Sequence, residues 1–242
     1  MTRALELAQA CERAGQFDRM RLHVEEVIAA LPRDTELSFE ELDLLEIALK
    51  NSIAPKRRSW RVIVDEERHQ SGIGNERLAA LARSEKISAE LELVEILGHG
   101  LDRTKDLLGR TLRLRSQIVL QKIKGDLSRY LAEIYMARGS EAREQVIEIA
   151  QQAKLAFDSA TELSREFDVT DPLRLSVSLH YSLFTHEILG RPKQACFIAR
   201  DAFAAGSAQL GSITNESSQK KSAHLLQLLR DNLCLWTSSR VP

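Results

Sequence analysis

The first residues that could do chemistry form a basic cluster around Pro55. Lys50 precedes the proline, and Lys56, Arg57 and Arg58 follow it directly. Guanidinium groups bind the oxygens of an anion in pairs and an ammonium group adds a point charge, so such a cluster suits an anionic ligand. A run of charge is more usually a solvated helix face, and the sequence by itself leaves both interpretations open.

A second cluster lies in the segment KIKGDLSRYLAE. Lys122, Asp126, Arg129 and Tyr130 recur there at the spacing that places side chains on one face of a helix. Asp126 can pair with the neighbouring cations and hold them in register. The same spacing also fits a surface ladder of ion pairs, with Tyr130 half-buried in the core.

Two segments near the C-terminus are apolar on two sides of a helix. In residues 173–189, one stripe consists of Leu179, Leu183 and Glu187. In residues 217–236, one stripe consists of Leu225, Leu228, Asn232 and Trp236. A helix that is apolar on both sides is usually deeply buried. The alternative is that one stripe faces the core and the other lines a groove. The polar members Glu187 and Asn232 favour the groove, because a core seldom holds unpaired polar groups.

Patterns typical of enzymes and of cofactor sites are missing from the sequence. Gly72 and Gly74 lack the third glycine and the preceding strand of a dinucleotide loop, and there is no P-loop. The six histidines have no zinc-binding spacing. The three cysteines are widely spaced, which predicts reduced thiols. We therefore expect a binding protein rather than an enzyme, without metal ion or cofactor.

The overall charge is balanced, with 34 basic and 35 acidic residues among 242. This balance gives no reason to expect nucleic acid or a membrane surface as a partner. No stretch approaches the roughly 18 apolar residues that span a bilayer, and the N-terminus has no apolar signal core. These features predict a cytoplasmic protein, and they do not exclude a location in the nucleus as well.

Helical periodicity dominates the whole chain. We expect a break at Ser52–Pro55 and either a break or a mere kink at Gly98–Gly100. We also expect a capping box formed by Ser38 and Glu41, and a helix opened by Asp171-Pro172. The expected helices are 2–14, 17–31, 38–51, 56–70, 75–97, 112–137, 141–166, 173–189, 193–207 and 217–236. Without a flexible linker, residues 1–242 are predicted to form one all-α domain of antiparallel helices.

Five segments of the chain resemble the 14-3-3 family, in the family's order. They are ALKNSIAPKRRSWRVI, KIKGDLSRYLAEIY, DPLRLSVSLHYSLFTHEI, PKQACFIARDAF and QLLRDNLCLWTS. The resemblance implies about nine antiparallel helices and a W-shaped dimer of cup-like protomers. Residues 1–110 would form the dimerisation half and the start of a groove, and residues 111–242 the rest of the groove. It also implies an adaptor that binds phosphoserine or phosphothreonine motifs of client proteins and sequesters, clamps or masks them.

The resemblance also implies a role for individual residues. The phosphate would be bound by Lys50, Arg57, Arg129 and Tyr130. The peptide groove would be formed by Lys122, Asp126, Leu179, His180, Leu183, Glu187, Leu225, Leu228, Asn232 and Trp236. The dimer interface would include Gln16, Arg19, Ser59, Lys86 and Glu90.

The chain departs from the family pattern in the groove and at the dimer interface. His180 stands where the family has Asn, and His224 where it has a groove-lining Leu. Gln16 replaces an Arg, and Arg19 replaces an Asp that would face Lys86. Like charges would weaken a homodimer and favour heterodimers with other family members. An alternative function is that of a degenerate paralogue that binds mainly unphosphorylated partners through the apolar wall.

Overall fold

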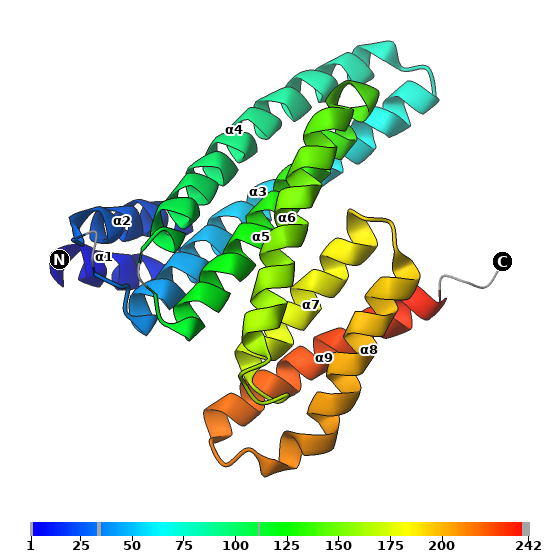
Figure 1. The fold of residues 1–242 in the computed structure, drawn as a ribbon. Helices are drawn as coiled ribbons and strands as arrows, with labels where there is room; N and C mark the ends of the chain where they lie inside the picture. Colours follow the sequence, from blue (N-terminus) through cyan, green and yellow to red (C-terminus); the bar gives the residue numbers. More distant parts are fainter. Residues whose placement is uncertain (1, 33–34, 111, 239–242) are drawn as a thin grey trace. The chain divides into compact units, whose positions relative to one another are not determined.

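The computed structural model describes residues 2–32, 35–110 and 112–238, and these residues form an all-α fold without strands. Short 3-10 segments occur at Gly139–Ala142 and Leu210–Ser212. In the described part of the chain there are nine α-helices: α1 (Thr2–Arg13), α2 (Phe17–Ala30), α3 (Phe39–Gly72), α4 (Glu76–Leu108), α5 (Leu114–Ala137), α6 (Arg143–Ser164), α7 (Pro172–Glu187), α8 (Pro192–Gln209) and α9 (Glu216–Ser238) (Figure 1). The predicted fold class is therefore confirmed.

Local signals set where several helices begin. The backbone nitrogen of Ser38 donates to Glu41 at 2.8 Å and the backbone nitrogen of Glu41 donates to the Ser38 hydroxyl at 3.2 Å, which completes the expected capping box at α3. Asp171 accepts from the backbone nitrogen of Leu173 at 2.7 Å and Pro172 opens α7, as predicted. These contacts satisfy backbone donors that a helix start leaves without partners.

The expected break at Ser52–Pro55 is wrong, because α3 runs through Pro55. A proline inside a helix costs about 3 kcal/mol, since its ring nitrogen cannot donate to the preceding turn. Ile53 and Trp60, which flank Pro55, are almost completely buried. Fully burying one such side chain contributes about 1.5–3 kcal/mol, so tertiary packing keeps the helix continuous.

Of the two alternatives at Gly98–Gly100, the break is excluded, since α4 continues from Glu76 to Leu108. Gly100 is buried, and the Thr104 hydroxyl donates to its carbonyl oxygen at 2.7 Å. Leu93 and Leu97 are completely buried on the same helix. Glycine weakens an isolated helix by about 1 kcal/mol, and the buried leucines of α4 outweigh that cost.

The chain divides into two compact units, residues 1–116 and 117–242. In the first unit α1 and α2 form a helical hairpin, α2 packs on α3, and α3 and α4 lie side by side as the longest pair (Figure 1). Contacts from Trp60 to Glu90 and from Lys56 to Glu92 show that α3 and α4 run antiparallel. The buried side chains of these helices form the core of the unit.

The second unit packs α6, α7, α8 and α9 against one another, with α5 on α6. Gly125 of α5 lies so close to the Phe157 ring of α6 that an added Cβ would stand 2.8 Å from it. Only glycine permits this approach of the two helices. The resulting packing fixes the register of α5, which carries the second cluster of charged residues.

Helices α7 and α9 run parallel along this unit. Near their starts, the Ser222 hydroxyl of α9 donates to the Thr170 carbonyl at 2.6 Å, one residue before the cap of α7. Near their ends, the Trp236 ring of α9 stacks on His186 of α7 with 4.6 Å between ring centroids. Residues at corresponding levels of the two helices therefore lie beside one another along their whole length.

Candidate binding site

Arg129 is the centre of a charged cluster in the second unit. Its side chain lies on α5 and the residue is only 4% exposed. One terminal nitrogen is 2.8 Å from Glu187 Oε2 on α7, and the other is 3.4 Å from Asp126 Oδ1 on α5. The pairing with Asp126 follows from the helical spacing, whereas the pairing with Glu187 requires α5 and α7 to meet.

Asp126 joins this arginine to His180 of α7. The His180 Nδ1 atom lies 2.5 Å from Asp126 Oδ2. Burial raises the pKa of the Asp126 carboxyl, but His180, Arg129 and Lys122 together lower that pKa well below its ordinary value. Asp126 is therefore a carboxylate at neutral pH and pairs with both Arg129 and His180.

The Arg129 guanidinium keeps its charge although it is buried. Burial lowers its pKa, but Tyr130, Asp126 and Glu187 outweigh that effect and raise the pKa above its ordinary value. The guanidinium carbon lies 4.5 Å from the centre of the Tyr130 ring, a cation–π contact. Its Nε atom is buried without a hydrogen-bond partner among the described residues. A buried fixed cation of this kind can bind an anion strongly.

Lys122 lies in the interior of the second unit, with 2% of its surface exposed. It is one of the cations that lower the pKa of Asp126. The resemblance assigns Lys122 to the groove, but the structure places its side chain among the most fully buried ones. In this structure Lys122 contributes positive charge from beneath the cluster.

A half-exposed face follows α7 and α9. On α7, Ser176, His180, Leu183 and Glu187 recur every three or four residues and are all partly or well exposed. On α9, the half-exposed residues at helical spacing are Leu225, Leu228 and Asn232. We call these seven residues the α7–α9 face. The Asn232 amide has no hydrogen-bond partner in the described part of the chain.

Two residues expected in the groove are instead buried beside this face. Leu179 is 4% exposed and Trp236 is 7% exposed, and both belong to an apolar cluster formed by α7, α8 and α9. Leu183, Leu225 and Leu228 pack against the same cluster from its partly exposed side. The leucines of the face are therefore held rigidly by the core below them.

The first unit holds Lys50 and Arg57, both on α3. Lys50 is exposed and Arg57 is half-buried. Between them in the sequence, Lys56 bridges to Asp18 at 3.2 Å and to Glu92 at 2.8 Å. Hydrogen bonding to Glu92 raises the pKa of Lys56, although burial opposes the effect. Lys56 is thus a structural cation that joins α2, α3 and α4, and Lys50 is directed to solvent.

Four of the five residues expected at a dimer interface have recorded contacts within their own unit. Arg19 donates to Gln16 at 3.0 Å, and both are exposed, as is Ser59. Lys86 lies 2.6 Å from Glu67, and buried Glu90 accepts from the Trp60 indole at 3.2 Å. The sequence did not reveal Glu67 as a partner. Burial raises the pKa of its carboxyl, but Lys86 and Arg83 lower that pKa by more, so it lies below its ordinary value.

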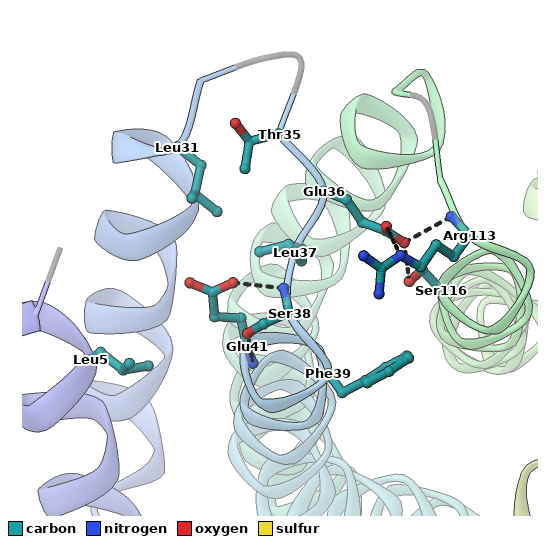
Figure 2. A pocket seen from close by; sticks show the side chains of 10 residues that line it. All are labelled: Leu5, Leu31, Thr35, Glu36, Leu37, Ser38, Phe39, Glu41, Arg113 and Ser116. Atoms are coloured by element: carbon teal, nitrogen blue, oxygen red, sulfur yellow. Dashed lines mark hydrogen bonds and ion pairs between the residues drawn. The ribbon is translucent and has the colours of Figure 1, made fainter.

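A cavity of about 530 Å³ lies in the first unit between the starts of α1 and α3 (Figure 2). Leu5, Leu31, Leu37 and Phe39 supply apolar walls. Glu36 accepts from the Ser116 hydroxyl and from the backbone nitrogen of Arg113, and Glu41 caps α3, so the carboxylates drawn in Figure 2 are already engaged. The polar side chains that line the cavity therefore connect the segments around it.

Two further observations hold for the described residues. None of their helices combines the length and the apolar character that crossing a bilayer requires. Within the same residues, no three or more His, Cys, Asp or Glu side chains gather as a metal ion would need.

Comparison with known proteins gives matches over nearly the whole chain. The sequence model of one family, described as "14-3-3 protein", matches residues 7–237. The "14-3-3 protein zeta" of Bombyx mori is 40% identical over 233 residues, which cover 96% of this chain and 90% of that protein. The "14-3-3-like protein RA215" of Solanum tuberosum is 38% identical over 235 residues, covering 96% and 89%. A "14-3-3 protein homolog" of Candida albicans is 38% identical over 233 residues, covering 96% and 84%.

Proposed function

The chain belongs to the 14-3-3 family of adaptor proteins, and from this premise we propose that it binds phosphoserine or phosphothreonine segments of client proteins. The observation that carries the proposal is the buried, permanently charged Arg129 between Glu187 and Asp126. A phosphate monoester brings a charge of about −2 and three strong acceptor oxygens. An arginine binds such a group through paired hydrogen bonds.

Phosphate binding at Arg129 would be an exchange of anions. Glu187 is 35% exposed at its side chain, whereas Asp126 is 13% exposed. The more exposed carboxylate can be displaced towards solvent at lower cost, so the phosphate takes the place of Glu187 while Asp126 continues to orient the guanidinium. Tyr130, which lies against the guanidinium, adds its hydroxyl as a donor.

The remaining phosphate ligands proposed from the resemblance are Lys50 and Arg57. Each would add a positive charge, and a cluster of cations is needed because one arginine does not neutralise a phosphate dianion. The resemblance of the segment ALKNSIAPKRRSWRVI to the family supports this assignment.

The α7–α9 face suits the peptide chain on either side of the phosphoresidue. The Asn232 amide, which has no partner in the described residues, can pair with a peptide group of the ligand. Leu183, Leu225 and Leu228 offer partly exposed apolar surface for ligand side chains. His180 uses Nδ1 for Asp126, so only Nε2 remains for the ligand. Unlike the Asn that it replaces, it cannot donate and accept at once.

Assembly is proposed to occur through the first unit. Large apolar side chains are exposed on α2, α3 and α4, namely Leu22, Val62, Leu78, Leu81, Ile87 and Leu91. Exposed large apolar side chains are typical of protein association sites when they lie together. Because Arg19 replaces an acidic residue, we propose that heterodimers with other family members are favoured over the homodimer.

Such a protein would act on its clients by binding alone. It would sequester a client, clamp its conformation or mask a segment of it, and no bond would be made or broken. The partners of the family are proteins, and we propose that the clients of this chain are bound in their phosphorylated state.

The test is a fluorescence titration with a phosphoserine peptide of basic composition and with the same peptide unphosphorylated. The proposal expects the phosphopeptide to bind at least tenfold more tightly, because charge-assisted hydrogen bonds are worth about 1.5–3 kcal/mol each. Phosphatase treatment of a captured client should release it. Equal binding of both peptides, and a client that stays bound after phosphatase, would instead establish the alternative of an adaptor for unphosphorylated partners.

A further inference from the structure

The α7–α9 face ends in two unpaired basic side chains at the start of α9. Lys221 and His224 precede Leu225 and Leu228 at the three- and four-residue spacing of one helix face. Both side chains are exposed, and neither forms an ion pair within the described part of the chain. The apolar part of the face therefore passes directly into a basic end.

Neighbouring carboxylates do not neutralise this end. Glu216 pairs with Lys220 at 2.6 Å, and Lys220 lies on a different side of α9 from Lys221. Asp231 accepts from Gln227 at 2.7 Å on the exposed side of the helix. Asp171 accepts from the backbone nitrogen of Leu173 as the cap of α7. The two basic groups are thus left to meet an anion from outside the protein.

The basic end lies a defined distance from the charged cluster. Ser222 bonds to Thr170, and Leu226 and Leu175 both lie against Gly206, so His224 is level with the first turn of α7. His180 is about eight residues farther along α7. At a rise of about 1.5 Å per helical residue this is roughly 12 Å, which an extended peptide crosses in roughly four residues.

We propose that Lys221 and His224 form a subsite for a carboxylate of the client peptide, an Asp or Glu side chain roughly four to six residues from the phosphoresidue. This rests on the proposed function, since the phosphate at Arg129 anchors the ligand at the other end of the face. Charge complementarity selects the occupant. The ligand class is therefore a phosphorylated segment with a distant acidic residue, whose carboxylate pairs with the Lys221 ammonium and accepts a hydrogen bond from the His224 ring.

The experiment uses the full chain and four phosphoserine peptides of equal length. In one peptide Glu occupies the fourth to sixth residue after the phosphoserine, and in another it occupies the fourth to sixth residue before it. Each of these two peptides has a partner with Gln at the same places. One Glu peptide should bind about threefold to tenfold more tightly than its Gln partner, as partly exposed ion pairs provide. Which of the two gains shows the direction of the chain. The gain should shrink when the salt concentration is raised.

Variants of adjacent residues give a matched control. The double variant Lys221→Gln/His224→Gln should abolish the gain and leave the affinity for the Gln peptides unchanged. Lys220→Gln, which removes the neighbouring but paired lysine, should preserve the gain. A gain that is absent, or that survives the double variant, would overturn the subsite while binding of the Gln peptides still supports the proposed function. Failure of every phosphopeptide to bind would overturn both.

Discussion

The two compact units place their charged residues in different surroundings. In the second unit Arg129 and Lys122 are buried to within a few per cent, and Asp126 of α5 and Glu187 of α7 hold the arginine from two helices. In the first unit Lys56 pairs with Asp18 and Glu92, whose side chains are about half exposed at 60% and 56%. Water therefore weakens the two ion pairs of Lys56 far more than it weakens the pair between Arg129 and Asp126.

The apolar residues show the opposite tendency. Exposed large apolar side chains are spread over α2, α3 and α4 of the first unit, and fewer are exposed on the second. We infer that the first unit associates through apolar surface that surface charges only adjust, and that the second unit binds its ligand through charge that its core holds in place. Three substitutions test this contrast.

The largest expected effect belongs to the buried charge of the second unit. Arg129→Ala should weaken binding of a phosphopeptide by about tenfold to hundredfold, because charge-assisted hydrogen bonds are lost where water cannot replace them. Isothermal titration calorimetry with a phosphoserine peptide measures the loss. Arg200→Ala, an exposed arginine of α8, is the control and should bind like the wild type. Wild-type affinity of Arg129→Ala, with an unchanged circular dichroism spectrum, would show that Arg129 is not a phosphate ligand.

The next effect concerns the carboxylate that orients Arg129. The pKa of Asp126 is lowered in the folded protein, so the carboxylate contributes stability above its unfolded pKa of about 3.9 and loses that contribution as the pH falls below it. Asp126→Asn should therefore lower the free energy of unfolding by about 1–2 kcal/mol at pH 7. The difference from the wild type should narrow below pH 4, as followed by urea denaturation. A difference that stays constant from pH 7 to pH 3 would assign the loss to packing and not to charge.

The smallest effect is expected at the surface of the first unit. Lys86 is already paired with Glu67, so the repulsion that Arg19 would exert on it in a homodimer is partly offset. Arg19→Asp should strengthen the homodimer by only a few-fold, since exposed ion pairs are worth about 0–1 kcal/mol each. Sedimentation velocity at low micromolar concentration measures the dissociation constant. Arg200→Asp, with the same charge change on the second unit, should leave the constant unaltered. A dimer that Arg19→Asp weakens would contradict the like-charge interpretation.

Local interactions explain what the sequence by itself determined about this protein. Helical periodicity predicted the fold class, because the pattern of apolar residues repeats within each helix and needs no distant partner. The capping box of Ser38 and Glu41 and the start of α7 at Asp171-Pro172 were predicted for the same reason. The pairing of Asp126 with Arg129 follows from a spacing of three residues on one helix.

The tertiary structure decided what depends on residues far apart in the chain. Helices α3 and α4 continue through Pro55 and Gly98–Gly100 because buried neighbours outweigh a weak local propensity. Glu187 meets Arg129 across 58 residues, and Glu67 takes up Lys86 from another helix, which no local pattern could indicate. Lys122 is buried, although the resemblance assigned it to the peptide groove. The cost of burying a charge is met only when partners from several helices converge on it, and that convergence exists only in the folded chain.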